Sequence, residues 1–585
     1  MNIWLDDARA GNETVRHFSN PHFIVEARTV DQLQDAFAVL ENARRSGYHL
    51  AGHCAYELGY ALEPRLKSAE SREYDFPLLR FGAFSRFEMH TSTAALRALQ
   101  ANTKGRCYTS PLRHDWKAGV YGQKFELVKR LIAAGDIYQA NLSFRSAFQA
   151  VGDPMALYLQ LRDHSKAAHG AFLLSGDQYI LSLSPELFFS INSTGDVVAK
   201  PMKGTRPRAA EAVADDLLKR ELRDSAKDRA ENLMIVDLLR NDLGRIARLG
   251  SVRAEELFVV ETYPTVHQMV STVRATLKSE IAIRDMLIAL FPCGSVTGAP
   301  KIRAMQIIRE LETTERGAYC GAIGYLSPDG SAEFNVAIRT LTISSGKGQL
   351  GIGGAIVHDS LMRSEYEECL LKARYYEQAR RPIELIETLR FSPQRGFDRV
   401  HRHLSRMQLS AKAFGIEFDS VAAAVALENS VADTTGDQRV RLALLENGEF
   451  SCTSSPIPEA APALWRYRFS SVTMSSKDAL LRHKTNWRDV YEAELSRLGS
   501  DEVLFMNEHG RVTEGSRTNI FVRRNGRLVT PRVGEGLLGG CLRQEMLESN
   551  ACAEGEVYPE DLAAADEIFL GNSLRGLIRA LPAKP

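Results

Sequence analysis

The sequence lacks an excess of charge of either sign. Its 585 residues include 73 Lys and Arg and 73 Asp and Glu, so the formal net charge is zero. A chain without a global electrostatic field is not attracted as a whole to nucleic acid or to an acidic membrane surface. We therefore expect neither partner, and any anion that the protein binds must be held by a local site.

The sequence also lacks clustered cysteines and long apolar runs. Eight cysteines are spread over the whole length without a CxxC pair, which excludes both a disulfide framework and a cysteine zinc site. The first residues, MNIWLDDARAGNE, are acidic and lack the basic region and apolar run of a signal peptide. No apolar stretch reaches the length of a membrane helix. These absences predict a cytoplasmic protein.

The length predicts two to four domains. A helical pattern runs through EYEECLLKARYYEQARRP (365–382) and stops at basic residues and a proline, and IELIETLRF then reads as a strand. We place the main boundary near residue 381, with domains at 1–380 and 381–585. Strand-like runs such as YILSLSPELFFSI and AEFNVAIRTLTIS alternate with long helical segments, which predicts a multidomain α+β fold.

The stretch KPMKGTRPR (200–208) combines a lysine, a glycine and two prolines. Glycine and proline punctuate a chain, so the stretch is expected to be a loop that follows an apolar strand. Taken alone, Lys203 in such a loop is more often a solvated charge than a reactive amine.

Carboxylates recur in 185–368. Glu186 ends an apolar strand, Glu231 lies in a helical segment, and Glu365, Glu367 and Glu368 form the cluster EYEE. Magnesium prefers carboxylate oxygens and water, so glutamates from two helices could hold the ion against a substrate carboxylate. A solvated helix surface is the competing interpretation of EYEE.

Cations and glycines complete this set. Arg339 is expected on an apolar strand, where it would need a carboxylate partner. GIGGAIV (351–357) permits close approach of the backbone to an anion. GSVTGAPK (294–301) does not have the spacing of a nucleotide-binding phosphate loop, which excludes that interpretation.

Nine motifs occur in the order found in chorismate-utilising enzymes, a family that they resemble over about residues 110–376. They are SLSPELFF, KPMKGTRPR, KDRAENLMIVDLLRNDLGR, ELFVVETYPTVHQMVSTV, FPCGSVTGAPKIRAM, GAYCGAIGYLS, FNVAIRTL, GIGGAIV and EYEECLLKA. The resemblance implies sandwich-like β-sheets covered by helices.

Within that family, Lys203 favours the aminodeoxychorismate synthase branch, because anthranilate synthases typically have alanine at this position. The resemblance implies that Lys203 attacks C2 of chorismate and that ammonia then displaces it by attack at C4. Glu186 would be the general acid and base. The attacking amine must be neutral, which burial or a nearby cation favours.

The same resemblance implies the remaining ligands of this site. Glu231 and Glu368 would bind Mg²⁺, with Glu365 near the ion or acting through water. The expected substrate-binding residues are Arg339, Tyr325, Gly353, Gly354, Thr205, His267 and Lys372. A purely structural role for His267 is about equally compatible with the sequence.

Three residues of 383–585 suit one cofactor. A lysine can bond to the aldehyde of pyridoxal phosphate, a carboxylate can hold its ring nitrogen protonated and an arginine can bind its phosphate. Arg406 is expected on the first helix, Lys484 after a strand-like run and Glu514 at a turn. Individually, each could be a surface charge.

Together these residues resemble the fold-type IV pyridoxal phosphate family, whose domain has two α/β lobes. LLGGCLRQEML (537–547) resembles its phosphate loop, which implies contacts from the amides of Cys541 and Leu542 and help from Ser516. The chain departs from the pattern of this family at two places. The opening segment is shortened to IELIETLRF, and Leu542 stands where the family frequently has threonine.

The two resemblances together imply synthesis of 4-aminobenzoate from chorismate, by amination and then elimination of pyruvate. No glutaminase motif is present, so ammonia is expected from a separate glutaminase subunit. The alternatives are an anthranilate synthase, an aminotransferase as the second domain, and a binding scaffold without catalysis. Homodimerisation is possible, as in other fold-type IV enzymes.

Overall fold

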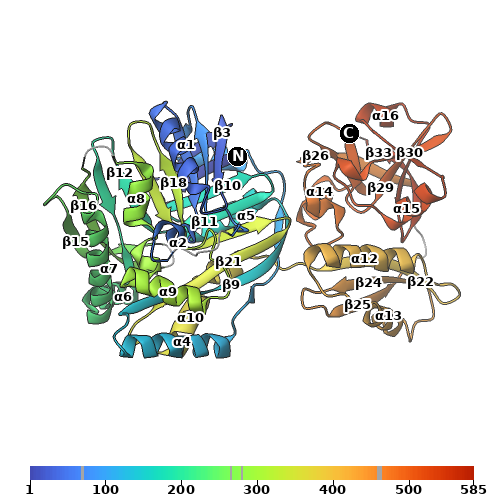
Figure 1. Cartoon of the computed structure of the whole chain (residues 1–585). Helices are drawn as coiled ribbons and strands as arrows, with labels where there is room; N and C mark the ends of the chain where they lie inside the picture. Colours follow the sequence, from blue (N-terminus) through green and yellow to red (C-terminus); the bar gives the residue numbers. More distant parts are fainter. Residues whose placement is uncertain (67–71, 264–265, 279–280, 458–463, 585) are drawn as a thin grey trace. The chain divides into compact units, whose positions relative to one another are not determined.

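The computed structural model describes residues 1–66, 72–263, 266–278, 281–457 and 464–584 (Figure 1). The chain divides into two compact units. Unit 1 comprises Met1–Asn102, Pro111–Phe148 and Tyr158–Ala379, and unit 2 comprises Thr103–Ser110, Gln149–Leu157 and Arg380–Pro585. Both units mix helices and sheets, so the predicted α+β fold class is confirmed. No helix in these ranges is long and apolar enough to cross a membrane.

Unit 1 contains two large sheets. The first sheet runs, in spatial order, through β17 (Gly298–Ala299), β9 (Gln139–Gly152), β21 (Lys347–Ile356), β20 (Thr340–Ser344), β11 (Gln178–Ser184), β10 (His169–Ser175), β1 (Asn2–Asp7), β2 (Thr14–Ser19) and β6 (Glu88–Thr91), with β8 (Arg113–His114) beside β9. The second runs through β14 (Met202–Pro207), β16 (Val266–Thr276), β13 (Asp196–Ala199), β12 (Leu187–Ile191), β19 (Ala332–Val336), β18 (Ala322–Leu326), β4 (His49–Cys54), β5 (Leu79–Phe84) and β3 (Phe23–Ala27), with β15 (Arg253–Thr262) beside β16.

The two sheets share an apolar core, as the sandwich-like prediction requires. Ile3, Leu173 and Ile180 of the first sheet belong to the same buried cluster as Phe84 and Ile323 of the second. Helices cover the sheets: α1 (Leu33–Arg45), α2 (Leu58–Leu62), α3 (Thr93–Gln100), α4 (Ala118–Ala133), α5 (Pro154–Ser165), α6 (Ala212–Asp224), α7 (Ala226–Gly244), α8 (Ile283–Leu290), α9 (Lys301–Leu311), α10 (Met362–Lys372) and α11 (Arg374–Ala379), with the 3-10 helix η1 (Gly294–Val296).

Unit 2 has two lobes, each built on its own sheet. The smaller lobe contains β23 (Gly396–Phe397), β22 (Leu385–Ser392), β24 (Gln438–Leu444) and β25 (Phe450–Pro456), with α12 (Val400–Phe414) and α13 (Ser420–Asn429). The larger contains β28 (Val512–Gly515), β27 (Glu502–Asn507), β26 (Leu464–Met474), β33 (Gly576–Pro582), β32 (Glu567–Asn572), β29 (Asn519–Arg524), β30 (Arg527–Pro531) and β31 (Ala553–Gly555), with η2 (Ala479–Arg482), α14 (Asp489–Leu498), η3 (Val533–Glu535), α15 (Cys541–Glu548) and α16 (Pro559–Ala563).

Four local predictions differ from the structure. KPMKGTRPR is not a loop, because β14 occupies an edge of the second sheet, where its proline is tolerated. Arg339 lies at a bend between β19 and β20, and its φ of 50° turns the chain from one sheet to the other. In unit 2, the run LLR before Lys484 forms η2, and Glu514 lies in the short strand β28.

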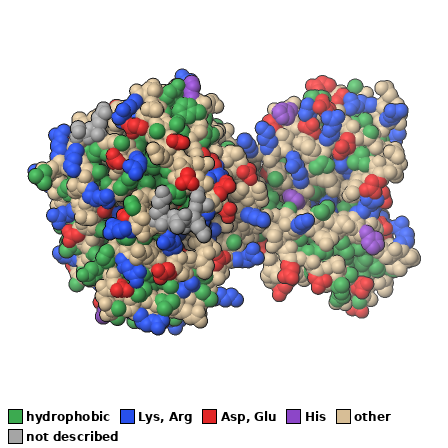
Figure 2. Space-filling view, in the orientation of Figure 1, with side chains coloured by type: hydrophobic (Ala, Val, Ile, Leu, Met, Phe, Trp, Pro, Cys, Tyr) green, Lys and Arg blue, Asp and Glu red, His purple; other side chains and the backbone are tan. Residues whose placement is uncertain are grey.

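Charges of both signs are interspersed over the visible face of each unit, and neither sign gathers into a continuous patch (Figure 2). This distribution agrees with the balanced composition. Anion binding therefore depends on particular buried cations, as the sequence predicts.

A buried ion pair fixes β1 to α5 in unit 1. Asp6 accepts from Nε of Arg162 at 2.7 Å and from the hydroxyl of Tyr158 at 2.9 Å, and all three side chains are buried. Removal of one partner leaves a buried charge without compensation, which is strongly destabilising.

We expect Asp6→Asn to lower the free energy of unfolding by roughly 3 to 5 kcal/mol, because it leaves the Arg162 guanidinium buried without its carboxylate. Urea denaturation measures this change. Asp7→Asn is the control, because it breaks an ion pair with the exposed Arg9 and should cost less than about 1 kcal/mol. Equal losses in the two variants would contradict the argument.

Candidate active sites

Lys203 lies in a distorted part of β14. The pairing of β14 with β16 is irregular between Met202 and Thr205. Gly204, with a φ of 80°, supplies this distortion, and a Cβ there would lie 2.9 Å from Cβ of Asp228. Only glycine fits this close approach to α7, which explains why Gly204 follows the lysine.

Ser295 connects the two residues that the sequence predicts to be catalytic. The amine of Lys203 donates to the carbonyl oxygen of Ser295 at 3.4 Å, while the Ser295 side chain lowers the pKa of the Glu186 carboxyl. Sequence reasoning missed Ser295, although it lies in the motif GSVTGAPK. The only signal was the position of that motif among those shared with the family.

Burial brings the pKa values of both catalytic candidates toward neutrality. Glu186 is 3% exposed, and burial raises the pKa of its carboxyl to about 7 against the opposing effects of Ser295 and Lys203. Its Oε1 atom has no hydrogen-bond partner among the described residues. Burial also lowers the pKa of Lys203. A carboxyl that titrates near pH 7 can both give and take a proton.

The predicted metal ligands lie on two helices. Glu231 lies on α7, and Glu365 and Glu368 lie on α10. Burial raises the pKa of Glu231 and of Glu365, and the neighbouring carboxylates raise both further. Lys372 instead lowers the pKa of the half-exposed Glu368. Glu367 is exposed and pairs with Arg363, as a surface residue does.

These three glutamates are a suitable donor set for magnesium, which keeps several waters and needs few protein ligands. A divalent cation would also relieve the mutual repulsion that raises the pKa values of Glu231 and Glu365. The carboxylate oxygens of these glutamates do not all lie within 4.8 Å of one another. In the part of the chain that the structure describes, the only group whose possible ligand atoms lie this close is Glu387, His403 and Cys541.

Lys372 and the two predicted glycines lie beside these carboxylates. The Lys372 amine is 2.9 Å from Oε1 of Glu368 and donates to the carbonyl oxygen of Gly353 at 2.9 Å. Burial favours a lower pKa for Lys372, but Glu368 raises it overall. A Cβ at Gly354 would lie 3.5 Å from the Lys372 amine and 3.7 Å from Oε2 of Glu365, so Gly354 borders the site.

Arg339 is a half-buried cation without an ion pair among the described residues. Its nearest titratable neighbours are Tyr263 and Tyr375, and burial lowers its pKa. The buried hydroxyl of Tyr375 also lacks a partner within the described ranges. A carboxylate ligand would satisfy both groups, which agrees with the expected role of Arg339.

The structure does not place Tyr325 with this group. Its ring contacts Phe18 and the guanidinium of Arg16, within the core between the two sheets. Tyr319 of the same motif packs over Gly351 and is an electrostatic neighbour of Cys369 on α10. The prediction chose the wrong tyrosine of GAYCGAIGYLS, because the sequence does not show which one faces α10.

His267 and Thr205 are engaged by protein groups. The ring nitrogens of His267 lie 3.0 Å from the Thr262 hydroxyl and 3.0 Å from a carboxylate oxygen of Asp215. Protein groups thus lie within hydrogen-bond distance of both ring nitrogens. The hydroxyl of the exposed Thr205 donates to the Gln268 side chain at 3.0 Å.

Lys484 of unit 2 follows η2 in a loop anchored to β22. Its carbonyl oxygen accepts from the amide of Ile386 at 2.8 Å, whereas its amine has no hydrogen-bond partner among the described residues. Burial and the nearby Arg406 lower the pKa of Lys484 to about 8. An amine that is about half neutral at pH 8 can react with an aldehyde.

Arg406 is held by Glu387, which His403 contacts in turn, and sequence reasoning missed both of these residues. The carboxylate of Glu387 accepts from Arg406 at 2.6 and 2.8 Å and also contacts His403 at 2.5 Å. His403 in turn lies 2.7 Å from the Ser573 hydroxyl. The spacing of His403 and Arg406, three residues apart on one helix, was the available signal.

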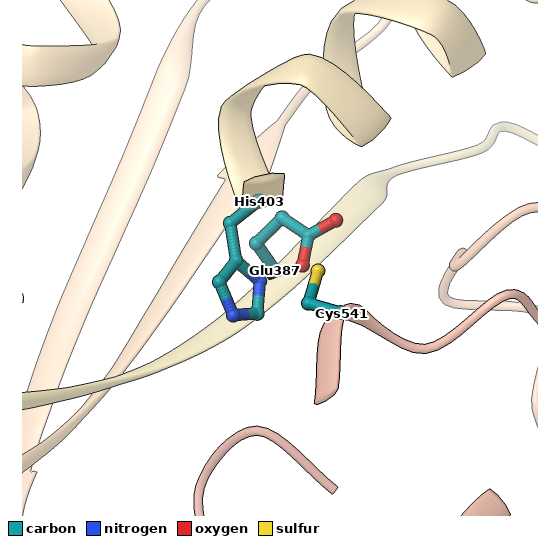
Figure 3. A group of neighbouring side chains, drawn as sticks. All are labelled: Glu387, His403 and Cys541. Atoms are coloured by element: carbon teal, nitrogen blue, oxygen red, sulfur yellow. Dashed lines mark hydrogen bonds and ion pairs between the residues drawn. The ribbon is translucent and has the colours of Figure 1, made fainter. Parts of the chain in front are cut away.

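Glu387, His403 and Cys541 have the composition of a metal site (Figure 3). Arg406 argues against that role, because its guanidinium occupies both oxygens of Glu387 and would repel a divalent cation. Arg406 also lowers the pKa of Glu387 to about 2. We interpret the group as the support of an anion-binding arginine.

Glu514 is positioned for a cationic partner. Its oxygens accept from the hydroxyl of Tyr491 at 2.8 Å and from the amide of Leu538 at 3.1 Å, and burial raises its pKa to about 7. A protonated ring nitrogen would stabilise the ionised carboxylate. Ser516 differs from expectation, because its hydroxyl donates to Glu502.

Cys541 and Leu542 form the first turn of α15, so their amides point out of a helix N-terminus, as predicted. The Leu542 side chain packs with Phe521 in a small apolar cluster. The amides of Cys541 and Leu542 are therefore free of the apolar packing that the Leu542 side chain makes, and that side chain offers no hydrogen-bond donor.

Comparisons with known proteins also place a boundary near residue 380, although the first match includes residues 103–110 and 149–157, which belong to unit 2. Residues 4–377 match the family described as chorismate binding enzyme, and residues 384–581 match amino-transferase class IV. The chain is 42% identical over 334 residues to aminodeoxychorismate synthase component 1 of Klebsiella aerogenes, covering 54% of this chain and 74% of that protein. It is 47% identical over 261 residues to the Escherichia coli (strain K12) protein of the same name, covering 44% of this chain and 57% of that protein.

The fold of unit 1 also resembles a solved structure. Anthranilate synthase component I from Streptococcus pneumoniae TIGR4 aligns with a TM-score of 0.53 at 26% identity, covering 62% of this chain and 91% of that chain. The shared fold does not by itself distinguish the two reactions.

We expect Glu186→Gln to raise the free energy of unfolding by roughly 3 kcal/mol at pH 8. The folded-state pKa is raised from 4.5 to about 7, so the stability present at low pH is lost as pH rises through this window. Glutamine removes that loss, and the two proteins should be equally stable at pH 4. Urea denaturation at both pH values measures the free energy of unfolding, with the exposed Glu367→Gln as the control. A gain in stability that is independent of pH would contradict the burial argument.

Proposed function

Because the chain belongs to the chorismate binding enzyme family over residues 4–377, we propose that unit 1 aminates chorismate to 4-amino-4-deoxychorismate. Unit 2 then eliminates pyruvate from this product to give 4-aminobenzoate. The observation that carries the proposal is that both catalytic candidates neighbour Ser295: its carbonyl oxygen accepts from the amine of Lys203, and its side chain lowers the pKa of the buried Glu186 carboxyl. A nucleophile and a proton donor so arranged suit replacement of a ring hydroxyl.

In the first step, the neutral amine of Lys203 bonds to C2 of chorismate, the ring double bond shifts, and the C4–O bond breaks. Glu186, protonated at pH values below about 7, gives its proton to the departing hydroxyl, which leaves as water. Ammonia then bonds to C4, the double bond returns and the C2–N bond breaks. Glu186 takes the surplus proton, which restores both residues.

Unit 1 must also hold the carboxylates of its substrate. Arg339 provides an unpaired guanidinium for one of them, with the hydroxyl of Tyr375 beside it. Glu231, Glu365 and Glu368 would hold Mg²⁺, whose charge would bind a second carboxylate. Lys372 keeps its position beside Gly353 and limits the negative charge of this cluster.

The class IV family of residues 384–581 implies pyridoxal phosphate. When bound, this group supplies an electron sink that acidifies the C4–H of the aminated substrate. Arg406 and the first amides of α15 would bind its phosphate, and Glu514 its ring nitrogen. Lys484, whose pKa is about 8, would take the C4 proton as a base.

The relatives matched by unit 1 are named component 1. This name supports a separate partner subunit, which we propose to be a glutaminase that delivers ammonia. Free ammonium would replace the partner at high concentration.

Incubation of the full chain with chorismate, Mg²⁺ and ammonium should yield 4-amino-4-deoxychorismate through Lys203 and Glu186. We expect Lys203→Ala to abolish this product and Glu186→Gln to lower its rate by about 10² to 10⁴, as measured by chromatography and mass spectrometry. Lys200→Ala is the control, because Lys200 lies in the same stretch but pairs with Glu261. Formation of anthranilate by the wild-type protein would refute the assignment of the first reaction.

With pyridoxal phosphate added, 4-aminobenzoate and pyruvate should form in equal amounts without a keto acid. We expect Lys484→Ala to stop both and to accumulate 4-amino-4-deoxychorismate, since unit 1 is unchanged. The exposed Lys477→Ala should behave as wild type. A requirement for a keto acid would instead identify unit 2 as an aminotransferase.

A further inference from the structure

Two short segments from the first half of the sequence belong to unit 2. β7 (Cys107–Thr109) pairs antiparallel with the last residues of β9, with Tyr108 opposite Val151. β9 itself is continuous from unit 1, to which its residues up to Phe148 belong. We call residues 103–110 and 149–157 the inserted hairpin.

The inserted hairpin contributes to the core of the smaller lobe. Tyr108 is 1% exposed and packs with Phe414 and Trp487, at ring distances of 5.0 and 6.3 Å. Val151 packs against the same cluster. Burial of a whole tyrosine contributes on the order of 2 kcal/mol or more, so the hairpin is an integral part of this lobe.

Two glycines permit the close packing of the inserted hairpin. A Cβ at Gly105 would lie 2.8 Å from Cβ and 2.9 Å from Cα of Asp478. A Cβ at Gly152, whose φ is 111°, would lie 2.1 Å from the carbonyl oxygen of Arg106. The hairpin is therefore fitted against the backbone that leads to Lys484.

Arg106 contacts both ends of the segment that carries Lys484. Its Nε donates to a carboxylate oxygen of Asp478 at 2.9 Å, and its guanidinium donates to the carbonyl oxygen of Trp487 at 3.1 Å. Asp478 is itself the N-cap of η2 and accepts from the amide of Leu480 at 2.9 Å. One side chain thus contacts both ends of the ten-residue segment from Asp478 to Trp487, which contains Lys484.

Further attachments of this segment come from β22, from the residues before it, and from Ser410 of α12, whose hydroxyl lies 2.9 Å from Nδ1 of His483. The amide of Ile386 donates to the carbonyl oxygen of Lys484, and the amide of Asn486 donates to that of Glu384. These contacts fix one edge of the loop. Arg106 holds the two ends of the segment, Asp478 and Trp487. Without these contacts the loop would be more mobile, and water could reach the buried amine of Lys484.

We propose that the inserted hairpin contributes to the pyridoxal phosphate site of unit 2 and that Arg106 is a positioning residue for Lys484. The inference rests on the proposed function only in that Lys484 bonds to pyridoxal phosphate. It adds a contribution from the first half of the sequence that the class IV domain does not contain.

The test compares wild type, Arg106→Ala and Arg106→Lys in the full chain, together with Asp478→Asn and the double variant Arg106→Ala/Asp478→Asn. Titration with pyridoxal phosphate gives the affinity, and competitive acetylation followed by mass spectrometry gives the pKa of Lys484 in the cofactor-free protein. Arg113→Ala, an exposed residue of β8 in unit 1, is the matched control. Thermal unfolding confirms that each variant is folded.

We expect Arg106→Ala to weaken pyridoxal phosphate binding at least about tenfold, with Arg106→Lys between it and wild type. Hydration of the loosened loop should raise the pKa of Lys484, and a rise of about one unit lowers its neutral fraction at pH 8 about fivefold. The double variant should bind pyridoxal phosphate no more weakly than the single variant with the lower affinity. Both single substitutions remove the same contact, that between Arg106 and Asp478. Amination of chorismate should be unchanged.

Unchanged affinity and an unchanged pKa of Lys484 in folded Arg106→Ala would overturn the proposal, as would additive effects in the double variant. A wild-type protein that does not bind pyridoxal phosphate would instead refute the proposed function of unit 2. The pKa comparison in the cofactor-free proteins would still decide the role of Arg106.

Discussion

Burial of ionisable groups without full charge compensation is the constraint on which both sites depend. Each unit places one lysine and one glutamate where water is excluded, and the titration of each moves toward neutrality: Glu186 and Glu514 to about 7, and Lys484 to about 8. Such placement costs stability in the protein without ligand. The sheets and helices around each site supply the packing that offsets this cost.

The identity of the site residues could be read from the sequence more easily than their geometry. Motif order predicted Lys203, Glu186 and Lys484, because reactive residue types recur in fixed sequence contexts. The strand β14 was not predicted, because pairing with β16, about sixty residues later, overrides the loop preference of glycine and proline. The sheet topology explains the error, since an edge strand tolerates the proline that a central strand would exclude.

Residues that act through contacts distant in the sequence were the ones missed. Ser295 meets Lys203 across 92 positions, and His403 meets Ser573 across 170. No periodicity links such pairs, so only the folded chain identifies them. The choice between Tyr319 and Tyr325 failed for a related reason: both lie in one motif, and the packing of Gly351 and α10 decides which is near the site.

The inserted hairpin makes the smaller lobe of unit 2 depend on residues from the first half of the sequence. A boundary near residue 381 describes two consecutive domains, and the opening segment of the second is shorter than its family pattern. The lobe nevertheless has a closed core, because Tyr108 and Val151 complete the cluster around Trp487. Because residues 103–110 and 149–157 contribute to its core, the smaller lobe cannot form fully until that part of the chain is folded. Loss of the hairpin would expose the apolar surface of the smaller lobe that it covers.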